Sequence, residues 1–495
     1  MTELDPGDRE FFRLVSRAAF ANPFGDERDR LDVRIARTPG DDPDLLTRLI
    51  ARVEERLSAL EAKQALRAAH FEAQDWELIE HAVLFEAFHR FAVRFDELIA
   101  EQLQAGATSL AVTFADSVLG RLTSRGIERA RAIRMLSLFW QMRRAYYFIA
   151  NSLTGRAPSM RRLREAIWND VFTHDLARFE RLLWDRLEDF SVILQGETGT
   201  GKGQAAAAIG RSGFIPFDEE RGRFRESFTE LLVSLNLSQF PETLIESELF
   251  GHKKGAFTGA VDAHPGVFAR CSPQGAIFLD EIGEVDPHVQ IKLLRVLQER
   301  VFAPVGSHEE RRFEGRVIAA THRDLEKLRA DKRFRDDFYY RLCSDVIVVP
   351  PLRQRLAEDP GELDVLLAHL VARIVGAPDA QALADIEIAI RTGLGEGYAW
   401  PGNVRELEQC VRRVLLTGRC EPDRGHAGGS DGADELARAI RAGTLQASAL
   451  VEEYCALLYD KAGTYEDVAK LTGLDRRTVR KYVVKVRGQS DDVES

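Results

Sequence analysis

The sequence contains no apolar run of about eighteen residues, the length that a membrane-spanning helix needs. Its first ten residues, MTELDPGDRE, are acidic and include no apolar segment of the kind found in secretory signal peptides. We therefore expect a cytoplasmic protein with no membrane partner.

Cysteine is scarce and has no metal-binding pattern. The five cysteines, at positions 271, 343, 410, 420 and 455, show neither C-x-x-C nor Cys/His spacing. This predicts reduced thiols in a reducing compartment. The formal net charge of −11 excludes a polycation that coats nucleic acid, so any DNA contact must come from a local basic patch.

The first 154 residues lack alternating strands and any acidic cluster at a strand end, which argues against a phospho-acceptor receiver domain. Apolar residues instead recur at helical spacing in three segments. These are Leu45 to Leu60, Phe85 to Phe95 and Leu136 to Phe148. The aromatic side chains could line a ligand pocket, although such a pattern more often reflects packing in a core. We expect an all-α domain over residues 1–154, regulatory by its position in the chain.

The segment from Ser191 to Gly203, SVILQGETGTGKG, joins a predicted buried strand to a glycine-rich turn. It contains the pattern G-x-x-x-x-G-K, in which backbone N–H groups and the lysine bind nucleotide phosphates. The predicted ligand-binding residues are Gly196, Glu197, Thr198, Gly199, Thr200, Gly201, Lys202 and Gly203. Gly203 stands where a Ser or Thr hydroxyl usually binds Mg²⁺. The alternative is a chance glycine turn between a strand and a helix.

Short apolar strands alternate with helices over residues 155–350, which predicts a parallel sheet with helices on both faces. The expected strands are Val192–Leu194, Leu231–Leu235, Ala276–Leu279, Val317–Ala320 and Val346–Val349. Asp280 and Glu281 follow the third strand. There Asp280 can hold Mg²⁺ and Glu281 can polarise an attacking water, unless the pair is only a solvated acidic turn.

Several blocks resemble those of bacterial enhancer-binding proteins, the AAA+ activators of sigma-54 RNA polymerase. The hexapeptide GAFTGA occupies Gly255, Ala256, Phe257, Thr258, Gly259 and Ala260. The further blocks are QIKLLRVLQERVFAPVGS, RVIAATHRDL, FRDDFYYRL, VPPLRQR and WPGNVRELEQ, in order between Gln290 and Gln409. The resemblance covers roughly residues 156–416. It implies an α/β P-loop ATPase subdomain at 155–350 and a helical lid at 351–419.

The resemblance also implies roles for single residues. The GAFTGA loop, an exposed loop with an apolar tip, would contact the sigma factor, and Asn236 would hydrogen-bond the catalytic Glu281. Thr321 and His322 match the first nucleotide sensor, where a structural role is nearly as good an interpretation. Arg335 and Arg341, on a predicted helix, match the arginine fingers that act on a neighbouring subunit's nucleotide, and Arg405 matches the second sensor. We expect Asn403 to cap the helix that carries Arg405.

A stretch rich in Gly and Asp predicts a flexible linker at residues 420–440. Beyond it, residues 441–495 have helix-turn-helix spacing, with an amphipathic helix at 445–459 and Gly473 at the turn. The expected DNA-binding residues are Arg476, Arg477, Thr478, Arg480 and Lys481. An ordinary basic helical hairpin is the alternative.

Together these features predict a multidomain bacterial transcription activator. It would bind enhancer DNA and assemble as a homo-oligomer, by resemblance a hexamer. ATP hydrolysis with Mg²⁺ would then remodel the closed complex of the sigma-54 RNA polymerase holoenzyme. Two rival classes remain: a general AAA+ remodeller of another protein, and a DNA-binding regulator whose ATPase has decayed, which Gly203 makes conceivable.

Overall fold

The computed structural model describes residues 3–40, 42–184, 186, 189–395, 397–420, 436, 440 and 446–487. The chain forms two compact units, one of residues 1–386 and 398–416, the other of residues 387–397 and 417–495. Most of the predicted linker lies outside the described residues. No helix in the described ranges is long and apolar enough to cross a membrane.

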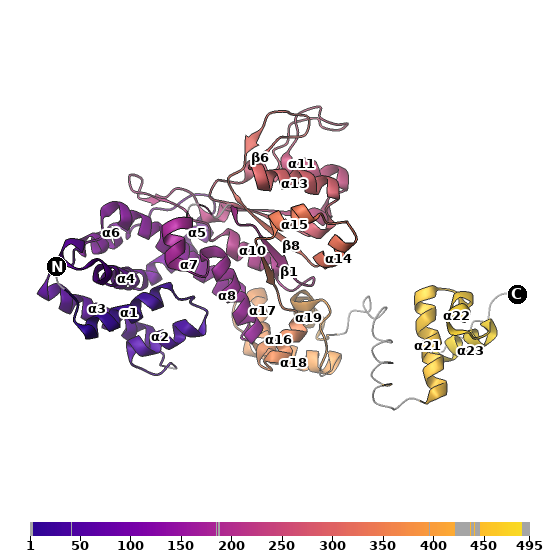
Figure 1. Cartoon of the computed structure of the whole chain (residues 1–495). Coiled ribbons are helices and arrows are strands. Elements are labelled where there is room, and N and C mark those ends of the chain that lie inside the picture. The colour runs from indigo at the N-terminus through magenta and orange to yellow at the C-terminus, as the bar shows by residue number, and fades with distance from the viewer. Residues whose placement is uncertain are drawn as a thin grey trace. The chain divides into compact units, whose positions relative to one another are not determined.

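The N-terminal region is helical, and the three periodic segments fall on helices as predicted (Figure 1). The helices are α1 (Pro6–Phe20), α2 (Asp26–Ala36), α3 (Leu45–Lys63), α4 (Ala73–Arg90), α5 (Ala92–Ala105), α6 (Ala115–Ser124), α7 (Arg129–Ser152) and α8 (Pro158–Phe172). The phenylalanine segment is divided between two of them. Phe91 leaves helical geometry, with φ −97° and ψ 5°, so Phe85 lies on α4 and Phe95 on α5.

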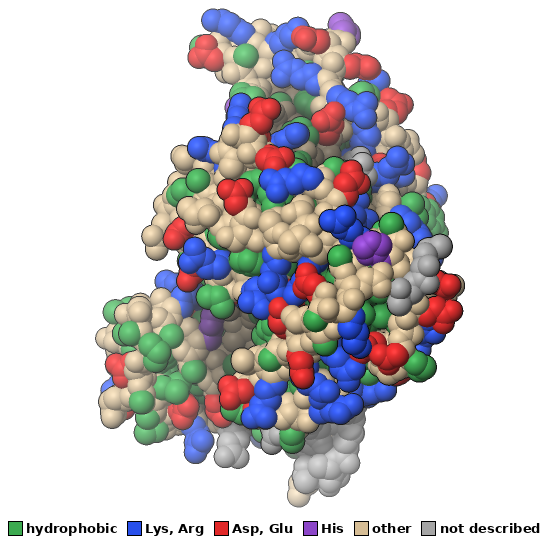
Figure 2. All heavy atoms as spheres, turned by 90° about the vertical axis from the view of Figure 1, so that its left-hand side faces the viewer, with side chains coloured by type: hydrophobic (Ala, Val, Ile, Leu, Met, Phe, Trp, Pro, Cys, Tyr) green, Lys and Arg blue, Asp and Glu red, His purple; other side chains and the backbone are tan. Residues whose placement is uncertain are grey.

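Buried charge joins three of these helices. The Glu86 carboxylate on α4 is fully buried and accepts hydrogen bonds from Arg90, Arg121 and Arg125, while Glu54 on α3 pairs with Arg121 and Arg125. On the surface of this region, Lys and Arg side chains are interspersed with Asp and Glu (Figure 2). The helical bundle is therefore held by ion pairs as well as by its apolar core.

The central sheet contains the five predicted strands, all parallel, in the order β4-β5-β8-β1-β9. Their bounds are β1 (Val192–Gln195), β4 (Leu232–Asn236), β5 (Ala276–Asp280), β8 (Arg316–Thr321) and β9 (Asp345–Val348). β1 lies between β8 and β9, with Ile193 paired to Ala319 on one side and to Val346 on the other. The predicted parallel sheet is confirmed.

Helices cover both faces of the sheet, as the alternation of strands and helices predicts (Figure 1). Val192 and Leu194 of β1 face α10 (Lys202–Gly210) and share one core with the N-terminal helices. Ile193 faces the opposite core, formed with α11 (Glu242–Phe250), α13 (Pro287–Glu299) and α15 (Asp336–Leu342). One hydrophobic core therefore runs without a break from the N-terminal bundle into the sheet.

The region predicted to form the lid contains α16 (Leu352–Glu358), α17 (Glu362–Val375), α18 (Ala380–Leu394) and α19 (Asn403–Thr417). A buried ion pair fixes it to the start of α8. Arg355 donates from Nε to Glu362 Oε1 over 2.7 Å and from Nη2 to the carbonyl of Thr154 over 2.7 Å. The second Glu362 oxygen accepts the backbone N–H groups of Arg156 and Ala157, over 2.5 and 3.0 Å.

In the second unit, the described residues 446–487 form α21 (Ala447–Ala462), α22 (Tyr465–Thr472) and α23 (Arg476–Arg487). Their small core consists of Cys455, Val468, Val479 and Val483. The amphipathic helix predicted before the turn thus corresponds to α21.

The expectation of five reduced cysteines is wrong for two of them. Cys410 and Cys420 are disulfide-bonded. Cys271, Cys343 and Cys455 are free thiols, and burial raises the pKa of each, that of Cys271 to about 12. A thiol with a raised pKa is a poor nucleophile at neutral pH.

We expect Glu362→Ala to lower the free energy of unfolding by about 3–5 kcal/mol, because it leaves the buried Arg355 guanidinium without a counter-charge. Urea denaturation of the variant measures this change. Glu299→Ala, which removes half of an exposed pair with Arg295, is the control and should change stability by less than about 1 kcal/mol. Equal effects of the two substitutions would contradict the buried-pair assignment.

Candidate nucleotide-binding site

The glycine-rich turn after β1 requires glycine at defined positions. Gly199 and Gly201 have φ of 81° and 105°, in the left-handed region that favours glycine. A Cβ on Gly199 would come within 2.3 Å of the Gly402 carbonyl, and one on Gly196 within 2.7 Å of the Val349 carbonyl. The loop thus has the tight curvature of a phosphate cradle.

Lys202 begins α10, as predicted, and folds back into the loop. Its side chain is almost fully buried, and Nζ donates to the carbonyls of Gly196 over 2.8 Å and Glu197 over 3.1 Å. Burial lowers the pKa of Lys202, while Glu281 and Asp280 act in the opposite direction. A buried ammonium satisfied only by backbone carbonyls fits a site for phosphate oxygens.

The two acidic residues follow β5, where sheet register places Asp280 beside Asn236 of β4. Burial raises the pKa of Asp280, and the neighbouring Glu281 raises it further. Glu281 has φ 59° and ψ 45°, a left-handed conformation that is strained for any residue with a side chain. Strain of this kind clusters at functional sites.

The hydrogen bond implied between Asn236 and Glu281 is replaced by two others. The Asn236 amide donates to Asp280 Oδ2 over 3.3 Å. Glu281 Oε2 instead lies 2.7 Å from Nδ1 of His322. Thr321, also predicted as part of the first sensor, is fully buried, and its carbonyl accepts the Gly196 N–H over 3.2 Å. His322 is thus the sensor residue whose side chain reaches the catalytic candidate.

The lid contacts the phosphate loop directly. The Asn403 amide nitrogen donates to Glu197 Oε2 over 3.1 Å and to the Thr198 carbonyl over 3.0 Å, while its oxygen accepts the Leu352 N–H over 2.8 Å. The prediction that Asn403 caps the helix is therefore wrong: the helix begins at Asn403, whose side chain is used elsewhere. Arg405, the second-sensor candidate, donates its backbone N–H to the Gly199 carbonyl over 3.3 Å.

Two contacts of the loop were missed by sequence reasoning. Arg353 binds the Glu197 carboxylate with both terminal nitrogens, and this contact is the main cause of a lowered Glu197 pKa. The second missed contact is that of Asn403, whose amide nitrogen donates to the same Glu197 carboxylate. Arg353 lies within the block VPPLRQR. The motif therefore pointed to this segment, but it gave no indication that Arg353 pairs with Glu197.

The arginine-finger candidates lie away from this cluster, on the face of the sheet covered by α13 and α15. Arg335 immediately precedes α15 and pairs with Asp337, and its N–H donates to the buried Gln290 amide over 2.9 Å. Arg341, within α15, donates from Nε to the Leu297 carbonyl over 2.9 Å. The structure thus brings together the loop, the carboxylates, the sensor and the lid, and leaves both arginines outside.

The GAFTGA segment is a turn between α11 and α12 (Val267–Arg270). Gly255 and Gly259 have φ of 79° and 103°, and the Gly255 N–H donates to the Ala260 carbonyl over 2.8 Å. Phe257 is 37% exposed and meets the His252 ring edge to face at 4.9 Å. Thr258 is exposed at the tip, Ala256 is half-buried and Ala260 is buried. The turn presents an apolar tip to solvent.

In the second unit, Gly473 with φ 69° ends α22, and the Asp475 carboxylate caps α23 through the N–H groups of Arg477 and Thr478. The basic residues form the exposed side of α23, opposite the buried Val479 and Val483. They are Arg476, Arg477, Arg480 and Lys481, with Thr478 half-buried beside them.

A parallel sheet with a glycine-rich phosphate loop after one strand, paired carboxylates after another and a helical lid defines a P-loop protein of the AAA+ type. Residues 174–348 match the family of the Sigma-54 interaction domain. They belong to that family, and the resemblance to sigma-54-dependent activators is confirmed.

The chain is also similar to bacterial regulatory proteins and to a solved structure. The chain is 41% identical over 278 residues to a Nif-specific regulatory protein of Azotobacter vinelandii, covering 55% of this chain and 46% of that protein. It is 43% identical over 238 residues to a Nif-specific regulatory protein of Bradyrhizobium diazoefficiens, covering 48% and 38%. The matched part thus spans less than half the length of either relative. A crystal structure of NtrX from Brucella abortus in complex with ATP aligns over 76% of this chain and 80% of that chain, with 19% identity and a TM-score of 0.42.

We expect Gly203→Ser to be accommodated, because the nearest atom to a Cβ at this position is 4.0 Å away. Replacing glycine within α10 should stabilise the protein by roughly 0.5 kcal/mol, measured by denaturation. The new hydroxyl should also lower the Mg²⁺ concentration needed for half-maximal nucleotide binding, measured by titration. Gly203→Ala is the control: an equal change in its Mg²⁺ dependence would show that the hydroxyl has no role.

Proposed function

We propose that this protein is an ATPase that activates transcription through sigma-54 RNA polymerase. The observation that carries the proposal is the buried Lys202 ammonium within the glycine-rich loop, held near Asp280 and Glu281. The exposed apolar turn at Phe257 is suited to contact with another protein, which supports the sigma factor as the target of the ATPase. Domain bounds follow the sequence motifs: regulatory helices at 1–154, ATPase at 155–350, lid at 351–419, linker at 420–440 and DNA-binding domain at 441–495.

In the proposed reaction, loop N–H groups and Lys202 bind the ATP phosphates. Glu281 polarises the attacking water, and His322 orients the Glu281 carboxylate through their 2.7 Å contact. Asp280 would hold Mg²⁺, and the metal would supply positive charge to the phosphate oxygens. Among the described residues no group of three or more His, Cys, Asp or Glu side chains could hold a metal ion.

A short path connects this site to the apolar turn. Asn236, which donates to Asp280, begins a short 3₁₀ turn (Leu237–Gln239) that is followed by α11. α11 ends at Phe250, a few residues before Phe257. Movement at the carboxylates therefore passes through one short helix to the turn. This path supports the coupling of hydrolysis to a change in the contact with the sigma factor.

The proposed cycle needs more than one subunit. Arg335 and Arg341 lie outside the nucleotide cluster of their own chain, which fits arginine fingers that act on a neighbouring subunit. We propose a ring, by resemblance a hexamer. The exposed basic side of α23 fits a helix that enters the major groove of enhancer DNA. Cytoplasmic localisation follows from this role.

Glu281→Gln should leave nucleotide binding intact and lower the rate of ATP hydrolysis by roughly 10²–10⁴-fold, because the amide cannot act as a general base. Lys202→Ala should weaken binding itself. Steady-state hydrolysis and nucleotide titration, both at concentrations that allow assembly, separate the two effects. Glu299→Gln, on the exposed side of α13, is the matched control. A rate unaffected by Lys202→Ala would favour a regulator with a decayed ATPase.

Phe257→Ala should retain ATP hydrolysis but lose the nucleotide-dependent complex with sigma-54, since the substitution removes the apolar tip and leaves the nucleotide site untouched. A pull-down with sigma-54 and an ATP transition-state analogue measures the complex. Val261→Ala, which truncates a neighbouring side chain that is 71% exposed, is the control. Retention of the complex by the Phe257 variant would favour a general AAA+ remodeller.

A further inference from the structure

The N-terminal helix α7 holds the far end of the helix that begins at the phosphate loop. Gln141 donates from Nε2 to the Ser212 carbonyl over 2.9 Å. Arg144 donates from Nη1 to the Arg211 carbonyl over 2.5 Å and from Nη2 to the Gly213 carbonyl over 2.7 Å. The three carbonyls follow directly on the last turn of α10, where backbone acceptors lack partners within the helix. Two side chains of α7 thus hold the turn that follows α10.

These two side chains are deeply buried. Arg144 and Gln141 are both 0% exposed, and the Arg144 guanidinium lies over the rings of Trp140 and Phe228, at 5.2 and 5.8 Å. Burial lowers the pKa of Arg144 to about 9, and Glu226 is the acidic group that offsets this effect. Burying a guanidinium costs desolvation free energy, and its hydrogen bonds to carbonyls offset this cost only while they are made. Breaking the contact between α7 and the turn after α10 would therefore leave a buried guanidinium without its carbonyl partners.

A hairpin strengthens the same interface. β2 (Phe217–Asp218) and β3 (Arg223–Phe224) follow α10, and the Phe217 N–H donates to Ser137 Oγ on α7 over 2.9 Å. The Phe224 ring stacks on Trp140 at 5.0 Å. Separating α7 from α10 would expose this aromatic surface and the three carbonyls together. The segment between α10 and β4 thus contacts α7 at residues 211–213, at Phe217 and at Phe224.

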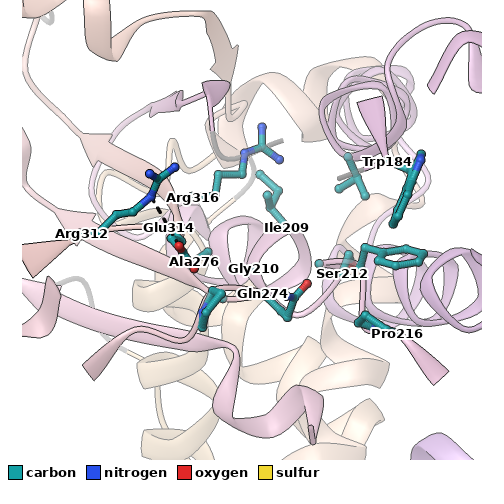
Figure 3. Close-up of a pocket in the computed structure, with 15 residues that line it drawn as sticks. Trp184, Ile209, Gly210, Ser212, Pro216, Gln274, Ala276, Arg312, Glu314 and Arg316 are labelled. Atoms are coloured by element: carbon teal, nitrogen blue, oxygen red, sulfur yellow. Dashed lines mark ion pairs between the residues drawn. The ribbon is translucent and has the colours of Figure 1, made fainter. Parts of the chain in front are cut away.

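The turn after α10 also lines a cavity. A pocket of about 310 Å³ is lined by Ile209, Gly210, Ser212 and Gly213, together with Trp184 and Gln274 (Figure 3). Its remaining walls include Arg312 and Glu314, which form an ion pair. The turn that α7 contacts is therefore also part of a pocket wall.

We propose that Arg144 and Gln141 are positioning residues of the nucleotide site, acting through α10. α10 has nine residues and is therefore a rod of about 13.5 Å with Lys202 at its other end. Ala205, Ala206 and Ala208 are fully buried, and their small side chains let α10 pack closely on the sheet. Freeing its C-terminal end lets the rod tilt, and the tilt displaces Lys202 and the loop.

The inference rests on nucleotide binding at the proposed site and extends it to the N-terminal helices. It makes α7 a supporting part of the nucleotide site, through the contacts of Arg144 and Gln141 with the turn after α10.

The test measures hydrogen–deuterium exchange over residues 202–210 and the affinity for a non-hydrolysable ATP analogue with Mg²⁺, both in the full chain. Arg144→Met should raise exchange of α10 and the dissociation constant about tenfold each, because it removes two charged hydrogen bonds. Arg144→Lys, which can reach one carbonyl, should restore part of both. Gln141→Leu should act in the same direction by about threefold.

Arg143→Met is the matched control, because Arg143 is the neighbouring residue of the same size and pairs with Asp96 within the bundle. It should leave exchange of α10 at the wild-type level. The proposal is overturned if both Arg→Met variants loosen α10 equally, or if α10 exchange and analogue binding stay unchanged in Arg144→Met. Should Arg144→Met fail to fold, an unchanged α10 in Gln141→Leu overturns it as well. A chain that binds the analogue but does not hydrolyse ATP refutes the proposed function and leaves this inference standing.

Discussion

Parallel pairing of β1 with β8 and β9 is the constraint on which the nucleotide site depends. Because the carboxyl ends of parallel strands share one edge of the sheet, the pairing sets the glycine-rich loop after β1 beside Thr321 and His322 after β8. β5, next to β8, adds Asp280 and Glu281 at the same edge. Strand order therefore brings these residues to one edge of the sheet.

The lid and the N-terminal helices hold opposite ends of the same element. At the start of α10, Asn403 from the lid binds the loop, while beyond its end Arg144 from α7 binds the carbonyls of Arg211 and Gly213. The buried Glu362 carboxylate joins the lid to the first residues before α8, so the lid and the bundle are also connected to each other. The loop is thus positioned by elements from both ends of the chain.

The strands and the phosphate loop could be predicted because each depends on local sequence: short apolar runs, glycines at fixed intervals and acidic residues after a strand. Side-chain partners were less predictable. Asn236 bonds to Asp280 and not to Glu281, and Asn403 bonds to the loop and not to its own helix. Such choices depend on where the strands and the lid meet. The contacts of Arg144 could not be predicted, because the sequence around an arginine on a helix does not show whether its side chain is buried or exposed to solvent.

Glu281 shows how a local backbone state can serve a reaction cycle. Its left-handed conformation costs about 1–2 kcal/mol relative to ordinary helical or extended geometry. The contact with His322 contributes to holding it there. In the proposed cycle, a carboxylate that left His322 for a water or a phosphate would let the backbone relax, and the energy recovered would offset part of the lost contact. Backbone strain of this kind would lower the free-energy cost of changing hydrogen-bond partners, a change that each round of a proposed hydrolysis cycle requires.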